Sequence, residues 1–228
     1  MAKTLVVCGY GPGVSNAVAE HFGSKGFPIA IAARNPDRLK AAEKALQAKG
    51  IQAAGFPTDM ASPEATRELF VRARAKFGPV GAFHWNSFAE GAGDLLTADP
   101  ATLHKLFDVS VVSFLAAVRE TLADLKAAQG AILVTNGGFG LMDPKVDASV
   151  VQYNAMGLGL ANTAKMKTTR LLAEKLRPEG IYVGEVMIGG LVKGTPWDNG
   201  NGTVDPKDVA TLFWDLYTKR DKLSASIQ

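Results

Sequence analysis

Residues Leu5 to Ser15 read LVVCGYGPGVS, an apolar run followed by three glycines at alternate positions. The run has the length and composition of a buried strand, and the residues after it continue with helical spacing. Glycine lets the backbone turn sharply and approach a phosphate closely, and the first amides of the next helix direct partial positive charge at it. The stretch therefore predicts a strand, a phosphate-binding loop and a helix, as in dinucleotide-binding units.

Apolar β-rich runs alternate with helix-period segments through the rest of the chain. Strands are expected at 4–8, 28–33, 51–56, 80–85, 130–135 and 180–186. Helices are expected at 13–25, 36–49, 63–77, 103–126, 151–176 and 206–219, the last followed by a polar tail. The pairs Asn35-Pro36 and Ser62-Pro63 each provide a helix cap followed by a first-turn proline.

Several of these strands are apolar throughout, which indicates burial on both faces of a parallel sheet. We therefore expect an α/β fold, a doubly wound parallel sheet of the Rossmann type, in a single domain spanning residues 1–228. The irregular segment at about 189–205 is expected to be a substrate or lid loop.

The 228 residues are 47% hydrophobic and 21% charged, with a net charge of +3. Basic and acidic residues are interspersed, so no nucleic-acid partner is expected. Cys8 is the single cysteine, which excludes an internal disulfide and fits a reducing compartment. We find no secretory signal, and the apolar run at 109–118 is too short to cross a bilayer. A cytoplasmic protein without a membrane segment is expected.

Other chemistries have little support in the pattern. His21, His84 and His104 have no carboxylate or cysteine at ligand spacing, so no metal site is predicted. Ser87 follows a strand and lies near His84, but it is not part of the Gly-x-Ser-x-Gly turn that hydrolases use.

The order of elements and the spacing of the glycine loop resemble the short-chain dehydrogenase/reductase family over nearly the whole chain. That family's first loop reads Thr-Gly, three residues, then Gly-x-Gly, and serine replaces the last glycine here. The resemblance implies that the loop residues Gly9, Gly11, Gly13, Val14 and Ser15 contact the cofactor. The Ser15 hydroxyl either bonds a phosphate or only caps the helix.

Arg34 and Asn35 follow the second strand, where an acidic residue would bond the ribose hydroxyls of NAD. Arginine suits a 2′-phosphate, which favours NADP(H) over NAD(H). The alternative is that Arg34 is a solvated residue at a strand end. Asp59 and Met60 follow the third strand, and the resemblance implies that Asp59 accepts a hydrogen bond from the adenine amine. A turn or cap aspartate is the alternative.

Two further strand ends complete the expected cofactor site. The fourth strand ends in HWNSF at 84–88, similar to the family's Asn-Asn-Ala-Gly. Asn86 keeps the second asparagine, and with Ser87 it is expected to order the cofactor side of the cleft. After the sixth strand, Gly189 resembles the family's Pro-Gly, and Thr195 matches a threonine that meets the nicotinamide amide.

In the family, a serine after the fifth strand and a Tyr-x-x-x-Lys pair on the next helix perform the chemistry. The tyrosine exchanges a proton, the serine holds the reacting oxygen, and the lysine grips the ribose. Here glycine falls at the serine position within TNGGF at 135–139, and Gly157 and Ala161 take the tyrosine and lysine positions.

The expected substitutes come from neighbouring positions. Tyr153, one turn before Gly157, is the expected proton donor, although neither register supplies the lysine. Asn136 is expected to donate a hydrogen bond in place of the serine. Ser110 takes the place of an asparagine on the preceding helix.

Aromatic residues flank the expected cleft and either line an apolar substrate pocket or pack structurally. They are Trp85, Phe88, Phe139, Tyr153 and Trp197. The helices beginning near Leu103 and Val151 are rich in small residues, and the resemblance implies a homodimer or homotetramer packed through them.

Two hypotheses about function follow. The first is an NADP(H)-dependent oxidoreductase that acts on a carbonyl or alcohol small molecule with a non-standard active site. The second is an NADP(H)-binding pseudoenzyme that acts as a sensor or scaffold without turnover.

Overall fold

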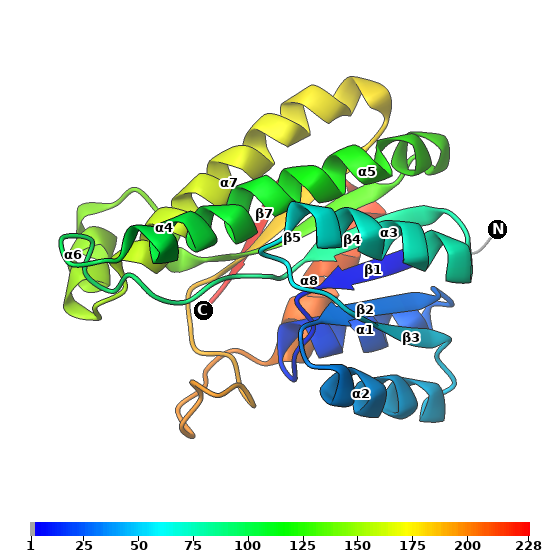
Figure 1. Cartoon of the computed structure of the whole chain (residues 1–228), viewed down its shortest axis with the longest axis horizontal. Coiled ribbons are helices and arrows are strands. Elements are labelled where there is room, and N and C mark those ends of the chain that lie inside the picture. Colours follow the sequence, from blue (N-terminus) through cyan, green and yellow to red (C-terminus); the bar gives the residue numbers. More distant parts are fainter. Residues whose placement is uncertain (1–2) are drawn as a thin grey trace.

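The computed structural model describes residues 3–228 and contains a seven-stranded sheet between two layers of helices (Figure 1). The strands pair in parallel in the order β3-β2-β1-β4-β5-β6-β7. They are β1 (Thr4–Cys8), β2 (Ile29–Ala33), β3 (Ala53–Pro57), β4 (Val80–Trp85), β5 (Ala131–Gly137), β6 (Tyr182–Ile188) and β7 (Ser224–Ile227). The order reverses between β1 and β4, the switch point where such sheets bind ligands. The predicted fold class is confirmed.

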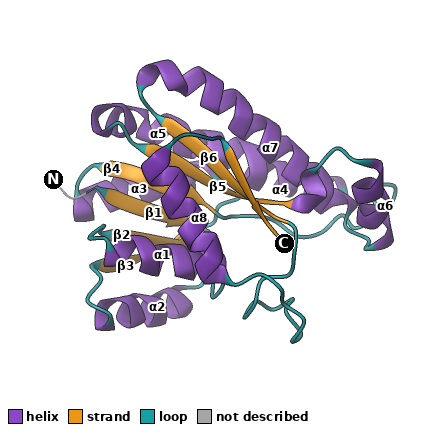
Figure 2. Ribbon diagram, turned by 180° about the vertical axis from the view of Figure 1, so that it is seen from behind, coloured by secondary structure: helices purple, strands orange, loops and turns teal. Residues whose placement is uncertain are grey.

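Each face of the sheet packs against its own set of helices (Figure 2). One face is covered by α1 (Val14–Ser24), α2 (Pro36–Ala48) and α8 (Pro206–Lys219), and the other by α3 (Pro63–Phe77), α5 (Ser113–Ala128) and α7 (Met156–Leu176). Fully buried aromatic side chains such as Phe22 and Phe114 fill the two layers. Burial on both faces explains why the central strands are apolar throughout.

The capping pairs read from the sequence act as predicted. The Asn35 side chain accepts a hydrogen bond from the Arg38 amide at 3.0 Å, and Ser62 accepts one from the Ala65 amide at 3.1 Å. Both helices then begin with proline, which fixes the first helical turn. The strands predicted at 4–8 and 80–85 and the helices predicted at 63–77 and 206–219 are confirmed to the residue.

The helix predicted at 103–126 is longer and is interrupted. It consists of α4 (Pro100–Phe107), a π-helical turn (Asp108–Val112) and α5. Asp99 caps its start by accepting from the Ala101 amide at 3.2 Å. By length and composition residues 100–128 could cross a membrane, with a mean hydropathy of 1.5 and 44% of the most apolar window buried. The α5 side chains Phe114 and Leu125 are fully buried against the sheet, as is typical of a core helix.

The prediction of a single helix at 151–176 is wrong at the start of that range. The chain forms α6 (Pro144–Gln152) and then α7, with Asn154 between them at φ 52°. The first amides of α7 are satisfied by a distant loop, because Met156 donates to the Gly93 carbonyl at 3.0 Å and Gly157 to that of Ala92 at 2.7 Å. The spacing of apolar residues within 151–176 carries no information about that loop, so it could not indicate where α7 begins.

Most of the remaining differences between predicted and observed boundaries lie at the ends of strands. The polar tail is in fact strand β7, which pairs with β6 at the edge of the sheet. The strand predicted at 51–56 begins two residues later, and β5 and β6 extend two residues beyond their predicted ends. Residues 189–205 form the expected irregular loop, which contains a short bridge between Val192 and Val204.

Charged groups are buried between β6 and α7. Glu185 is fully buried on β6 and accepts from Arg170 Nη2 and Asn136 Nδ2, each at 3.4 Å. Lys165, on the sheet-facing side of α7, is 3% exposed. Burial raises the pKa of Glu185, whereas burial lowers the pKa of Lys165 to about 8 and the nearby Glu185 charge partly opposes that shift.

This buried lysine predicts a pH-dependent stability. In the folded protein Lys165 loses its proton near pH 8, but in the unfolded chain only near 10.5. The unfolded state therefore binds more protons between these values, so the free energy of unfolding rises with pH. Urea titrations at pH 7 and pH 10 should show wild type gaining about 2 kcal/mol relative to Lys165→Met. Parallel pH profiles for the two proteins would contradict the assignment.

Candidate functional site

The glycine loop lies at the carboxyl ends of β1 and β4. Gly9 has φ +83°, and a Cβ there would lie 2.7 Å from the backbone N and Cα of Ser87. Asn86 Nδ2 donates to the Gly9 carbonyl at 3.1 Å. The loop is thus held against the residues that follow β4, and the role of Asn86 toward a cofactor stays a prediction. Ser87 is buried, and its Oγ has no hydrogen-bond partner among the described residues.

Gly13 is the N-cap of α1, and no side chain caps this helix start. Ser15 Oγ accepts from the Gly11 amide at 2.8 Å and donates to the Gly11 carbonyl at 3.2 Å, so it stabilises the loop itself. The Ser15 hydroxyl therefore does not cap α1, whose start has no side-chain cap, and its contact with a phosphate stays a prediction. The space beside Gly11 is open within 4 Å, which leaves room for a phosphate.

The loop at 189–205 reaches over this cradle. A Cβ on Gly13 would lie 2.7 Å from Thr195 Cγ2 and 3.6 Å from Val192 Cγ1. The Thr195 hydroxyl donates to the Val192 carbonyl at 2.7 Å, which holds the turn. Thr195 therefore lies next to the helix start, while Gly189 packs against Gln228 at the other end of the loop.

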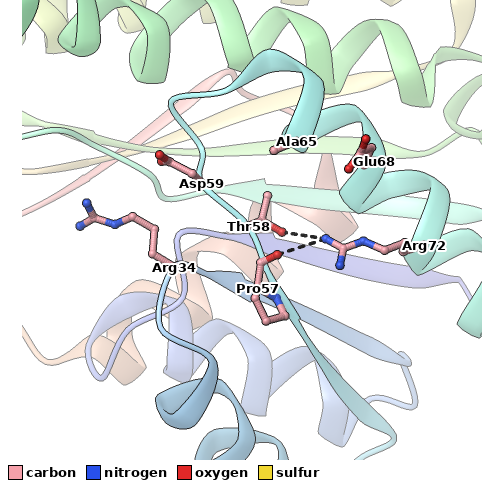
Figure 3. Close-up of a pocket in the computed structure, with 7 residues that line it drawn as sticks. All are labelled: Arg34, Pro57, Thr58, Asp59, Ala65, Glu68 and Arg72. Atoms are coloured by element: carbon pink, nitrogen blue, oxygen red, sulfur yellow. Dashed lines mark hydrogen bonds between the residues drawn. The ribbon is translucent and has the colours of Figure 1, made fainter.

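A pocket of about 540 Å³ opens beside the ends of β2 and β3 (Figure 3). Arg34 is exposed on one side of it, and Arg72 on the other side donates to the Pro57 carbonyl at 3.2 Å and to Thr58 Oγ1 at 3.3 Å. The lining residues are Arg34, Pro57, Thr58, Asp59, Ala65, Glu68 and Arg72.

The other residues expected at the ends of β2 and β3 have local structural roles. Asn35 caps α2, Asp59 Oδ1 accepts from the Ala61 amide at 3.1 Å, and Met60 is buried. Asp59 therefore forms a turn, which was its alternative reading, and it also lines the pocket where the adenine was expected.

Within residues 3–228, no hydrogen bond joins the three residues expected to take part in catalysis. Asn136 is 1% exposed, and its amide is engaged by Glu185 and by the Gly137 amide at 3.2 Å. Ser110 is 3% exposed and donates to the Leu106 carbonyl at 2.6 Å, inside the π-helical turn.

Tyr153 occupies a different environment. It ends α6 instead of lying on α7, and it is 68% exposed. Its ring stacks on Phe139, with centroids 6.2 Å apart. The phenol is therefore at the rim of the site, next to the turn that follows β5.

The backbone of the loop at 91–92 lies against Gly157, the position that the resemblance gives to the family's tyrosine. A Cβ on Gly157 would lie 2.7 Å from the Ala92 carbonyl oxygen and 2.8 Å from that of Gly91. A larger side chain cannot be accommodated at Gly157 unless the loop moves away from α7.

Asn162 on α7 was not singled out from the sequence. It is 5% exposed, and its Nδ2 would lie 2.6 Å from a Cβ placed on Gly137, the last residue of β5. The only signal for Asn162 in the sequence was its place directly after Ala161, which takes the family's lysine position. Its proximity to Gly137 depends on how α7 packs, which the sequence does not show.

No cluster that could hold a metal ion is found in residues 3–228. His84 is fully buried, and its Nε2 lies 2.8 Å from Thr135 Oγ1. Burial lowers the pKa of His84 to about 3, so the ring is neutral near pH 7. We assign it a structural role.

A glycine cradle that a Cβ would fill, next to an open strand-end pocket with an exposed arginine, fits a phosphorylated dinucleotide. The sites at Gly9 and Gly13 are too narrow for side chains, while the space at Gly11 is open. The residues present therefore fit a nicotinamide cofactor.

Comparison with known proteins agrees with this geometry. The short-chain dehydrogenase/reductase SDRA of Arabidopsis thaliana is 24% identical over 179 residues, which cover 78% of this chain and 66% of the plant protein. A 2,5-dichloro-2,5-cyclohexadiene-1,4-diol dehydrogenase of Sphingobium indicum is 26% identical over 190 residues, covering 82% and 72%. The chain thus spans about two thirds of the plant protein's length.

Solved structures share the fold. A short chain dehydrogenase from Burkholderia cenocepacia in complex with NADP has a TM-score of 0.87 at 22% identity, covering 99% of this chain and 96% of that one. The family profile described as short chain dehydrogenase matches residues 3–201. Because that match includes the glycine loop, the cleft and most of the sheet, the chain belongs to the short chain dehydrogenase family.

Proposed function

We propose that this protein is an NADP(H)-dependent oxidoreductase that interconverts a carbonyl and an alcohol on a small molecule through a non-standard active site. The observation that carries the proposal is the glycine cradle beside the exposed Arg34, at the strand end where an acidic residue would favour NAD. A guanidinium presents several donors in a fixed plane and suits a 2′-phosphate.

The relatives support this choice of chemistry. The Burkholderia cenocepacia structure is described in complex with NADP, and a metagenomic short-chain oxidoreductase structure likewise. The Sphingobium indicum relative is named as a diol dehydrogenase. Two of these names include NADP and the third a diol as the compound dehydrogenated, which supports the proposed cofactor and the proposed class of substrate.

In this proposal the protein orients the reactants. The bound cofactor would supply or accept the hydride. The amides at the start of α1 hold the pyrophosphate, and Thr195 brings the loop at 189–205 over it. Tyr153 is the proton donor from the rim, which requires its exposed side chain to turn into the cleft when substrate binds.

One observation favours the second candidate, an NADP(H)-binding protein without turnover. The loop at 91–93 fills the position that the resemblance gives to the tyrosine, and two amides of α7 bond to its Ala92 and Gly93 carbonyls. A proton donor cannot be restored at Gly157 by a single substitution. The cofactor site would remain intact in such a protein.

A two-step experiment separates the candidates. NADPH is titrated by fluorescence, and the loss of NADPH absorbance is then followed with a broad panel of aldehydes and ketones. The first candidate predicts binding and oxidation with some members of the panel. Tight binding without oxidation across the panel favours the second, and no affinity for NADPH or NADH rejects both.

We also propose that the protein is cytoplasmic and assembles into a homodimer or homotetramer. Exposed apolar side chains on the long helices support a second copy packing there. They are Val112, Leu122, Leu160 and Leu171.

Arg34→Ala is expected to weaken NADPH binding about tenfold to a hundredfold, because a hydrogen bond to a charged group contributes about 1.5–3 kcal/mol. NADH affinity should remain unchanged, since NADH has no 2′-phosphate. Arg38→Ala, which removes another exposed arginine one turn along α2, is the matched control. Equal losses for both cofactors, or an equal loss in the control, would reject the role of Arg34.

Tyr153→Phe is expected to lower kcat about a hundredfold or more if Tyr153 is the proton donor. The substitution keeps the ring that stacks on Phe139, so stability and NADPH affinity should not change. Tyr182→Phe, at the opposite end of the sheet, is the control. Steady-state kinetics on a substrate from the panel measure the effect, and unaltered activity would make the assignment wrong.

A further inference from the structure

The turn after β5 is pressed onto α7 with no space for a side chain between them. A Cβ on Gly140 would lie 2.8 Å from the Asn162 carbonyl carbon and 2.9 Å from its Cβ. Thr163 Oγ1 on α7 donates to the Gly140 carbonyl at 3.1 Å. This contact fixes the position of Asn162 relative to the end of β5.

Asn162 then takes the volume of a neighbouring side chain. Gly137 ends β5, and its absent side chain leaves a space that the Asn162 carboxamide enters, with Nδ2 2.6 Å from the Cβ position, Cγ 3.5 Å and Oδ1 3.8 Å. The amide nitrogen is therefore the group closest to the place where the family carries its serine side chain.

The other candidates for holding an oxygen are engaged or distant. The Asn136 amide bonds to Glu185, and the Ser110 hydroxyl bonds to Leu106 within its own helix. Tyr153 is exposed at the rim. Asn162 is more than nine-tenths buried and lies beside Gly137, the last residue of β5.

We propose that Asn162 holds the reacting oxygen of the substrate, by a hydrogen bond from Nδ2, in the place that serine takes in related enzymes. A carboxamide has two N–H donors, so it can hold a carbonyl or alkoxide oxygen as a hydroxyl does. Gly137 and Asn162 therefore form a complementary pair, in which the loss of one side chain makes room for the other. This inference rests on the proposed oxidoreductase function.

The test measures recognition of oxygen without requiring turnover. Binding of 4-fluoroacetophenone to the NADP⁺-saturated protein is followed by ¹⁹F NMR, in parallel with 1-ethyl-4-fluorobenzene, which has a similar shape but no oxygen. Wild type should prefer the ketone, and Asn162→Ala should weaken ketone binding about tenfold while leaving binding of the hydrocarbon unchanged. A purely structural role would shift both ligands together.

Two further variants keep the test decisive. Asn162→Asp preserves the shape but replaces the donor with an acceptor, so it should lose the ketone preference even if the alanine variant is unstable. Gly137→Ser alone should be destabilised, because its Cβ meets the Asn162 amide. Gly137→Ser combined with Asn162→Ala should recover both stability and the ketone preference, since the hydroxyl then replaces the amide.

The outcomes are distinct from those that test the proposed function. If wild type does not prefer the ketone, or if Asn162→Asp keeps the wild-type preference, the role of Asn162 is rejected even when NADPH binds. If NADPH does not bind, the oxidoreductase proposal fails. The ketone preference is then measured on the protein without cofactor, where its loss in Asn162→Asp still tests the hydrogen bond from Asn162. Thr168→Ala, another polar substitution on α7, serves as the control and should behave like wild type.

Discussion

Close backbone approaches at the carboxyl edge of the sheet determine what this site can hold. Gly9 passes within side-chain distance of Ser87, and Gly157 does the same with Ala92, so neither position tolerates even a methyl group without movement. The first contact forms the cofactor cradle, and the second covers the start of α7. In both places the absence of a side chain lets two segments of backbone meet.

Local signals were sufficient where structure is decided locally. The cap and proline pair at Asn35-Pro36 satisfies the amides of its own helix, and apolar runs identify buried strands, so these elements were predicted closely. The break between α6 and α7 was missed because Asn154 adopts φ 52° and a loop some sixty residues earlier satisfies Met156. Strand β7 was missed because a short polar edge strand depends on its neighbour β6.

The candidate site was predictable in part for a similar reason. The sequence predicts the cofactor loop and a role for Arg34, and it has glycine or alanine at the positions that the resemblance gives to the catalytic side chains. It does not show what occupies their places, because Ala92 and Asn162 reach Gly157 and Gly137 only through tertiary packing. A glycine at a catalytic position therefore has two meanings, a lost group or a space filled by another part of the chain.

The lysine of α7 that lies nearest to the family's position is buried and does not replace the missing one. Ala161 takes the family's position, and Lys165 lies one turn further along the same face, where it is buried near Glu185. Its amino group therefore lies in the layer between α7 and β6. A cation beside a hydroxyl stabilises its ionised form, so its absence weakens any base in the cleft but still permits a group to donate a proton.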